Sequence, residues 1–175
     1  LHWQHSTVLT EGSELGIPKL NIVLVEPDYA NAGNIARTCA VTGARLHLVG
    51  PYGFRWMTSI QAGGTGLLAL VEVCDYENLD DLFRPPSRSR RPGLADHHQG
   101  PRSYTEAIFT PDSWLFFGKE TKGLPEEFLA AHYDSCVRIP IRAEARSLNL
   151  SNSAAVGVFE ALRQQDFPHL KTEGK

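Results

Sequence analysis

The sequence contains few cysteines, no long apolar run and no excess of positive charge. Its three cysteines, Cys39, Cys74 and Cys136, lack metal-ligand spacing and lie in apolar surroundings. Their odd number argues against a disulfide framework and indicates reduced core thiols, as is usual in a cytoplasm. No apolar run approaches the ~20 residues that a membrane span needs, and residues 1–19 lack the pattern of a signal peptide. We therefore expect a cytoplasmic protein with no membrane segment.

The charge balance gives no general support for nucleic-acid binding. The formal net charge is −3 at pH 7, so any RNA contact must come from a local patch. Arginines gather around one Pro/Ser-rich stretch, and these are Arg84, Arg88, Arg90, Arg91 and Arg102. The length and the hydrophobic content of 42% suit one domain with a sizeable core. We expect residues 1–18 to form a loose N-terminal extension and residues 19–170 to form that domain.

Apolar runs that alternate with helical patterns predict an α/β fold around a mostly parallel sheet flanked by helices. Strands are predicted at Leu20–Val25, Arg45–Val49, Leu68–Val73, Trp114–Phe117 and Val137–Ile141. Helices are predicted at 31–42 with Gly43 as a stop, at 75–83 with Asp75 as a cap, weakly at 104–109, and at 126–131 and 152–165. The stretch Arg84–Gly100 reads as an inserted or mobile loop.

Polar segments follow three of the predicted strands. In the first, Asn31 or Asn34 can cap a helix whose N-terminus favours anions, and Arg37 then emerges about one turn inside. An arginine at this place can grip a phosphate in a planar fork. The alternative is a solvated arginine on an amphipathic helix.

The second and third segments also lie between a strand and a helix. Gly118 directly follows Trp114–Phe117, where a glycine lets backbone approach a ligand closely, although a routine connection has the same composition. In the run from Ser147 to Asn152, Ser151 or Asn152 is expected to serve as the N-cap. Ser147 and Asn149 then have no capping task and remain candidates for a site.

These three segments, in this order, resemble the three motifs of the SpoU/TrmH-type (SPOUT class) RNA ribose 2′-O-methyltransferases. The resemblance is strongest to the small members that act on the tRNA wobble position (cytidine or uridine). It implies a C-terminal trefoil knot, a homodimer, S-adenosyl-L-methionine as cofactor, tRNA as substrate and no metal. The implied catalytic residues are Arg37, Asn31, Ser147 and Asn149, and the implied cofactor-binding residues are Gly118, Glu120, Ile139, Ser147, Leu148 and Asn149.

Several features leave alternatives open. The run Gly64–Ala69 fits a relaxed dinucleotide fingerprint but follows no apolar strand. Asp96-His97-His98 begins a manganese phosphoesterase signature, yet lacks further clustered aspartates and reads better as a polar strand end. Residues 61–66 lack the charges that the small wobble enzymes carry there, and the turn near Asp96–Gly100 departs from the family's cofactor contact. A ribosomal RNA methyltransferase of the same family and a non-catalytic RNA-binding module are therefore the rival functions.

Overall fold

A seven-stranded parallel sheet forms the centre of the protein. The computed structural model describes residues 18–56, 66–84, 92–96 and 100–174. The strand order is β3-β2-β1-β6-β4-β7-β5, and every paired neighbour is parallel. The strands are β1 Asn21–Val25, β2 Arg45–Val49, β3 Val73–Tyr76, β4 Pro92–Asp96, β5 Arg102–Ser103, β6 Trp114–Phe117 and β7 Cys136–Arg138.

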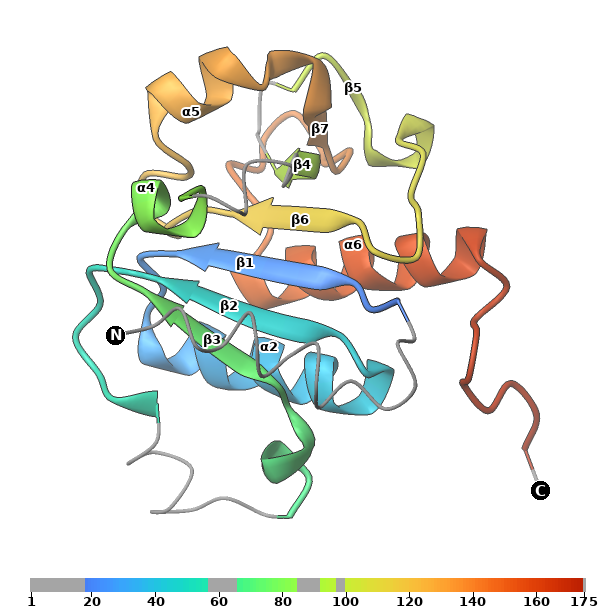
Figure 1. Cartoon of the computed structure of the whole chain (residues 1–175). Coiled ribbons are helices and arrows are strands. Elements are labelled where there is room, and N and C mark those ends of the chain that lie inside the picture. Colours follow the sequence, from blue (N-terminus) through green and yellow to red (C-terminus); the bar gives the residue numbers. More distant parts are fainter. Residues whose placement is uncertain (1–17, 57–65, 85–91, 97–99, 175) are drawn as a thin grey trace.

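Helices cover both faces of this sheet (Figure 1). The two long helices, α2 (Tyr29–Thr42) and α6 (Leu150–Gln164), lie side by side under one face. The short helices α4 (Leu79–Leu82) and α5 (Glu126–Ala131) lie over the other. Single 3₁₀ turns occur at Leu68–Leu70, Tyr104–Glu106 and Tyr133–Ser135. The prediction of an α/β fold with a mostly parallel sheet flanked by helices is therefore confirmed.

The central strands β1 and β6 are apolar apart from Asn21, because both of their faces are buried. In β1, Ile22 and Leu24 belong to the core beneath α2 and α6, whereas Val23 and Val25 belong to the core on the α4 and α5 side. Successive side chains of a strand point to opposite faces, so a continuous apolar run is what a doubly covered parallel strand requires. The predicted strands at 20–25, 45–49 and 114–117 are confirmed within a residue.

Two predictions in the middle of the chain were wrong. Leu68–Leu70 forms a 3₁₀ turn, and the third strand is Val73–Tyr76, where only Cys74 and Tyr76 are buried. An edge strand with one covered face alternates, so the short apolar run before it was the misleading signal. The helix expected over 75–83 spans only Leu79–Leu82, and Asn78, not Asp75, caps it by accepting a hydrogen bond from the Asp81 N–H at 2.9 Å.

The prediction of a loop over Arg84–Gly100 was also wrong in part. Pro92–Asp96 is β4, which lies inside the sheet between β6 and β7. Proline as the first residue of a strand costs little, although it donates no ladder hydrogen bond. The pairing register shifts between Pro92 and Leu94. Residues 85–91 and 97–99 lie outside the described part of the chain, as do residues 1–17 of the expected N-terminal extension.

The helix ends and the last strand differ from expectation by a few residues. Helix α2 begins at Tyr29 with Asp28 as its N-cap, not Asn31 or Asn34, and ends as predicted at Gly43, whose φ of 76° is left-handed. Strand β7 spans Cys136–Arg138, so it begins one residue before and ends three residues before the 137–141 expected. Helix α6 begins at Leu150, two residues before the expected start at 152, and its Phe159 is 45% exposed. The three cysteines are buried free thiols, as predicted.

Candidate active site

The three polar segments meet at the carboxyl edge of the sheet. They follow β1, β6 and β7, and these strands run in the same direction within one sheet. Parallel strands therefore deliver their C-terminal loops to one edge, the usual ligand-binding edge of an open α/β sheet. The segments that carry the family resemblance therefore lie at one edge of the sheet.

The Asn31 side chain connects all three segments. Its Nδ2 donates to Asp28 Oδ2 at 2.7 Å and to Glu120 Oε2 at 3.3 Å. Its Oδ1 accepts from Asn149 Nδ2 and from the Ser151 N–H, both at 3.3 Å. Asn31 is 5% exposed, so these contacts satisfy a buried amide from both ends.

Asn149 has two tasks at this junction. Its Oδ1 caps helix α6 by accepting from the backbone N–H groups of Ser151 at 3.0 Å and Asn152 at 3.3 Å. Its Nδ2 also donates to Glu120 Oε1 at 3.4 Å. The expectation that Ser151 or Asn152 would cap this helix was wrong, because Asn149 lies one residue before the first helical turn and reaches both N–H groups. We call Asn31, Glu120 and Asn149 the amide–carboxylate junction.

Asp28 supports the junction from the start of α2. Its Oδ1 accepts from the Asn31 N–H at 2.9 Å. Burial alone would raise the pKa of Asp28, but the hydrogen bonds from the backbone and side chain of Asn31 bring this pKa below its usual value of 3.8. Asp28 is therefore ionised at neutral pH and complements the positive end of the helix dipole.

Position 118 requires glycine because the backbone of Gly123 and Leu124 lies directly against it. A Cβ at this position would lie 2.0 Å from the carbonyl carbon of Gly123 and 2.1 Å from the Leu124 nitrogen. The Gly123 N–H donates to the Lys119 carbonyl at 2.6 Å, and Gly123 has a φ of 70°. No L side chain fits at Gly118 without moving backbone, so the loop 118–124 is tightly folded over the end of β6.

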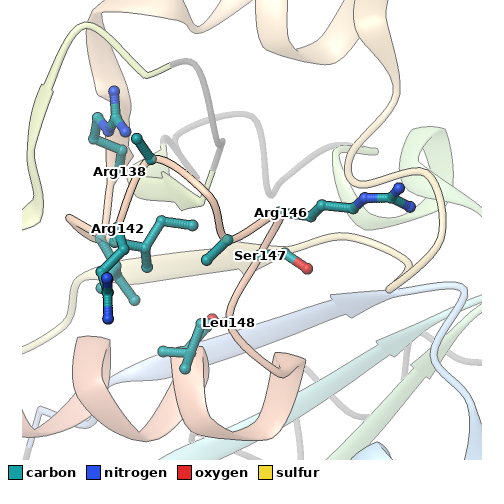
Figure 2. Close-up of a pocket in the computed structure, with 10 residues that line it drawn as sticks. Arg138, Arg142, Arg146, Ser147 and Leu148 are labelled. Atoms are coloured by element: carbon teal, nitrogen blue, oxygen red, sulfur yellow. The ribbon is translucent and has the colours of Figure 1, made fainter.

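Two cavities open beside this loop and share one wall. One, of about 250 Å³, is lined by Ile139, Ser147 and Leu148 among others, and Figure 2 shows Arg138 and Arg142 toward one side of it and Arg146 extending to the opposite side. The other, of about 360 Å³, is lined by Gly118, Glu120, Ser147 and Leu148 among others. Arg146, Ser147, Leu148 and Ser153 belong to both linings. All predicted cofactor-binding residues except Asn149 line one or both of these cavities, and Asn149 contacts Glu120 directly.

Arg37 lies apart from these cavities within the chain. It is exposed on α2 and makes no hydrogen bond or ion pair with any residue in the described ranges. It lies about two turns from the first residue of the helix, not one, because α2 begins earlier than predicted. The structure therefore brings Asn31, Ser147 and Asn149 together with the residues predicted to bind the cofactor, but does not bring Arg37 to them in one chain.

Sequence reasoning missed several residues around the site. Arg146 and Ser153 line both cavities, and the former directly precedes Ser147. Asp28 could have been found as the first capping residue after the strand. Of the arginine-rich set, Arg84 pairs with Asp81 at 3.2 Å and Arg102 donates to the Asp134 carbonyl at 2.6 Å. Arg88, Arg90 and Arg91 lie outside the described residues.

The other candidate chemistries gain no support from the described part of the chain. Within it, no group of three or more His, Cys, Asp or Glu side chains is arranged to hold a metal ion. Asp96 ends β4, whereas His97 and His98 lie outside the described ranges. Of the Gly64–Ala69 fingerprint, residues 64 and 65 also lie outside them, and Leu68 and Ala69 belong to a 3₁₀ turn. The helices of the described ranges are too short or too polar to traverse a lipid bilayer.

Comparisons with known proteins identify the relatives of this chain. The SpoU rRNA Methylase family model matches residues 19–159. The tRNA (cytidine(34)-2'-O)-methyltransferase of Yersinia pestis is 37% identical over 155 residues, which cover 85% of this chain and 96% of that protein. A solved structure concerning the 2-OH methylation of C/U34 on tRNA has a TM-score of 0.77 and 35% identity, and covers 86% of this chain and 99% of its own.

A more distant solved structure extends the comparison. The AdoMet-bound rRNA methyltransferase from Sinorhizobium meliloti has a TM-score of 0.71 and 28% identity, with 83% of this chain and 56% of that chain covered. The family match spans more than half of the sequence and includes every residue of the amide–carboxylate junction. The chain therefore belongs to the SpoU rRNA methylase family.

Proposed function

We propose that this protein is an S-adenosyl-L-methionine-dependent tRNA methyltransferase that acts on the 2′-hydroxyl of the wobble ribose, with cytidine or uridine as the target. The observation that carries the proposal is the amide–carboxylate junction, which ties the loops after β1, β6 and β7 together beside two cavities. The names of the Yersinia pestis relative and of the C/U34 structure support the substrate.

The residues around the two cavities suit an adenosine-containing cofactor. Ile139, Leu148 and Leu150 offer apolar walls for a base, and Ser147 offers a hydroxyl. Gly118, where the backbone of Gly123 and Leu124 leaves no space for a Cβ, lines the 360 Å³ cavity. S-adenosyl-L-methionine supplies an activated methyl group on a sulfonium, so the protein's task is alignment of the two substrates and help with the hydroxyl proton. The junction residues Asn31, Glu120 and Asn149 hold the loops in register for that alignment.

Arg37 completes the proposed site from a second subunit. It is exposed and lies on α2, beside α6, whose Phe159 is 45% exposed. We propose a homodimer in which this helix face is covered and Arg37 faces the cofactor of the partner. A guanidinium stays protonated and is a poor base, so its tasks are to clamp a phosphate and to polarise the ribose hydroxyl.

We further propose that residues 19–170 form a single domain with a C-terminal trefoil knot, and that the protein acts in the cytoplasm. The family membership supports the knot. A chain that must thread itself refolds slowly. Refolding after dilution from urea should therefore lie below the ~1 s⁻¹ lower bound of ordinary small domains, and a rate in the millisecond range would argue against the knot.

Three measurements test the function. Calorimetry in chelator should show S-adenosyl-L-methionine binding, and an absolute metal requirement would contradict the proposal. Arg37→Ala should leave that affinity nearly unchanged while lowering methyl transfer at least ~100-fold, the scale of a lost catalytic group. Mass-spectrometric mapping of ribose methylation in RNA from cells lacking the protein should show loss at the tRNA wobble position.

Ribosomal RNA is the second candidate substrate, because the family description names it. Loss of methylation only in ribosomal RNA would decide for it.

For tRNA, we propose that the arginine-rich stretch clamps the anticodon stem backbone. Serine at Arg88, Arg90 and Arg91 together should then weaken tRNA binding and reduce its salt dependence, because fewer counterions are released. An unchanged affinity and salt slope would rule the clamp out.

A further inference from the structure

A third cavity continues the carboxyl edge away from the two proposed for the cofactor. It measures about 320 Å³ and is lined by Glu26, Asp28 and Tyr52, among others. Lys119, Glu120 and Thr121 line both this cavity and the 360 Å³ cavity that contains Ser147. The two spaces therefore lie on either side of one loop, and the third is of the size that small-ligand sites have.

One aromatic ring, that of Tyr52, lines this cavity, and it belongs to a cluster of three rings. The Tyr52 ring is half-buried there, and Phe54 packs 4.8 Å from it, centroid to centroid. Tyr29 meets Phe54 edge to face at 5.6 Å and is itself 57% exposed. The Tyr52 hydroxyl donates to Asp75, and burial together with that carboxylate raises the Tyr52 pKa, so the hydroxyl is occupied within the protein. What this cluster offers to a ligand is ring surface, which suits an unpaired nucleobase.

Glu26 offers the cavity an unused carboxylate. Its backbone N–H donates to the Val49 carbonyl at 2.7 Å, but its side chain makes no hydrogen bond or ion pair with residues in the described ranges. Asp28 differs, because Asn31 occupies both of its oxygens. Glu26 also has a φ of 51°, which glycine adopts more easily than any L residue. Local backbone geometry alone would favour glycine here, so an outlier of this kind points to a task for the side chain.

We infer that this third cavity binds the unpaired cytosine of the target nucleotide. The Tyr52 ring lies against the base, and the Glu26 carboxylate accepts a hydrogen bond from the exocyclic amine. The inference rests on the proposed function, because it requires an RNA substrate at this edge. Carboxylates accept from cytosine N4, whereas uracil presents an acceptor oxygen at the same place. Glu26 is therefore a specificity-determining residue that favours cytidine over uridine.

The experiment compares two anticodon stem-loops that differ only in having cytidine or uridine at the wobble position. Methyl transfer gives the ratio of kcat/KM values for the two RNAs. Binding of the same stem-loops, already 2′-O-methylated at that ribose, gives the ratio of Kd values without any turnover. The parent should prefer cytidine in both, and Glu26→Gln should reduce the preference about tenfold, the scale of one lost base contact.

Three further variants separate recognition from folding. Glu127→Gln, at an exposed carboxylate on α5 that lines none of the three cavities, should leave the preference unchanged. Glu26→Gly should lose the preference while keeping or raising the unfolding temperature, since it relieves the positive φ. Phe54→Ala should weaken binding of both RNAs by a similar factor, because Phe54 supports the Tyr52 ring and stacking on that ring tolerates any base.

The outcomes distinguish this inference from the proposed function. Equal methylation and binding of the two RNAs by the parent, or a preference that survives Glu26→Gln, would overturn the cytosine site and leave the methyltransferase intact. A Glu26-dependent binding preference without any methyl transfer would support the site and count against the proposed function. Absence of any RNA binding by the parent would overturn the cytosine site, while cofactor calorimetry would still test the function separately.

Discussion

The partners of the Asn31 side chain disfavour a charged residue at this position. Its nitrogen faces two carboxylates, Asp28 and Glu120, and its oxygen faces two N–H donors, the Asn149 amide and the Ser151 backbone. Only a side chain with both a donor and an acceptor completes this arrangement. The orientation of the amide is thus determined by its partners, and the three loops of the site depend on one buried side chain.

Asn31→Asp should therefore destabilise the protein more than Asn31→Ala does. The aspartate has the same shape but places a third carboxylate against Asp28 and Glu120, whereas alanine only leaves partners unsatisfied, at about 1–3 kcal/mol. The charged variant should recover stability on acidification to pH 5, as its new carboxyl takes up a proton. Urea unfolding at pH 5 and pH 7.5 measures both effects. Equal stability of the two variants at pH 7.5 would contradict this interpretation of the junction.

Gly118→Ala tests the close approach at the end of β6. A Cβ there would lie 2.0–2.5 Å from three backbone atoms of Gly123 and Leu124, so the loop must move. We expect a loss of stability of at least ~2 kcal/mol, as for other overpacked or strained sites. Gly157→Ala is the matched control, since its Cβ would lie 3.4 Å from the Leu115 and Phe117 side chains, which can adjust. Thermal unfolding of both variants measures the effect. A loss of stability in Gly118→Ala alone would show that the close approach in the loop is responsible, and not the removal of a glycine as such.

Among the elements, the sequence predicted those whose pattern is local. β1 and β6 are continuous apolar runs, and Gly43 ends α2 as a left-handed residue. β4 was missed because its position between β6 and β7 depends on strands distant in the sequence, and strand formation follows such context more than local preference. The same holds for the residues of the candidate site. The order of the motifs predicted which loops contribute to it. The N-cap formed by Asn149 and the position of Arg37 depend on where α6 and α2 begin, which the sequence left uncertain by a few residues.

The two tasks of Asn149 can be separated at the start of α6. Aspartate is as good an N-cap as asparagine, so Asn149→Asp should keep the helix stable. It removes the amide donor to Asn31 and Glu120 and adds a charge beside the latter, so cofactor affinity and methyl transfer should fall. Asn149→Ala should also lose about 1 kcal/mol of stability. If Asn149→Asp retained full methyl transfer, the residue would be a cap alone.

The ion pair between Glu160 and Arg163 near the end of α6 should make the stability of the protein depend on pH. Hydrogen bonds from Arg163 at 2.8 and 2.9 Å hold the pKa of Glu160 below its usual 4.5, and Gln164 also donates to it. A lowered folded pKa means that the stabilisation is fully present above the unfolded pKa and is lost as pH falls through the folded one. Glu160→Gln should therefore be less stable than the parent at pH 7, with the difference shrinking below pH 4. The exposed Glu173→Gln is the control, and a difference that stays constant with pH would exclude the ionised contact.

For the whole molecule, the main question is why the proposed catalytic arginine lies away from the cavities. Arg37 is exposed on α2, whereas Ser147 lines both cavities on the cofactor side. If two copies share each site, two defective chains should repair one another. In a mixed dimer of Arg37→Ala and Ser147→Phe, one site combines an intact arginine with an intact cofactor cavity. Ser147 is exposed, so phenylalanine there blocks the cavity mouth without filling the core.

We therefore expect each variant alone to be inactive and their unfolded and co-refolded mixture to recover methyl transfer. Random pairing makes half of the dimers mixed, and each mixed dimer holds one intact site of two, so recovery should approach a quarter of the parent rate. Light scattering would establish that all samples are dimers. As a control, refolding each variant separately before mixing should give no recovery at once. If the co-refolded mixture stays inactive while dimers form, Arg37 acts within its own chain or not at all. A site shared between two chains would leave one intact site in every mixed dimer, and that site would be active.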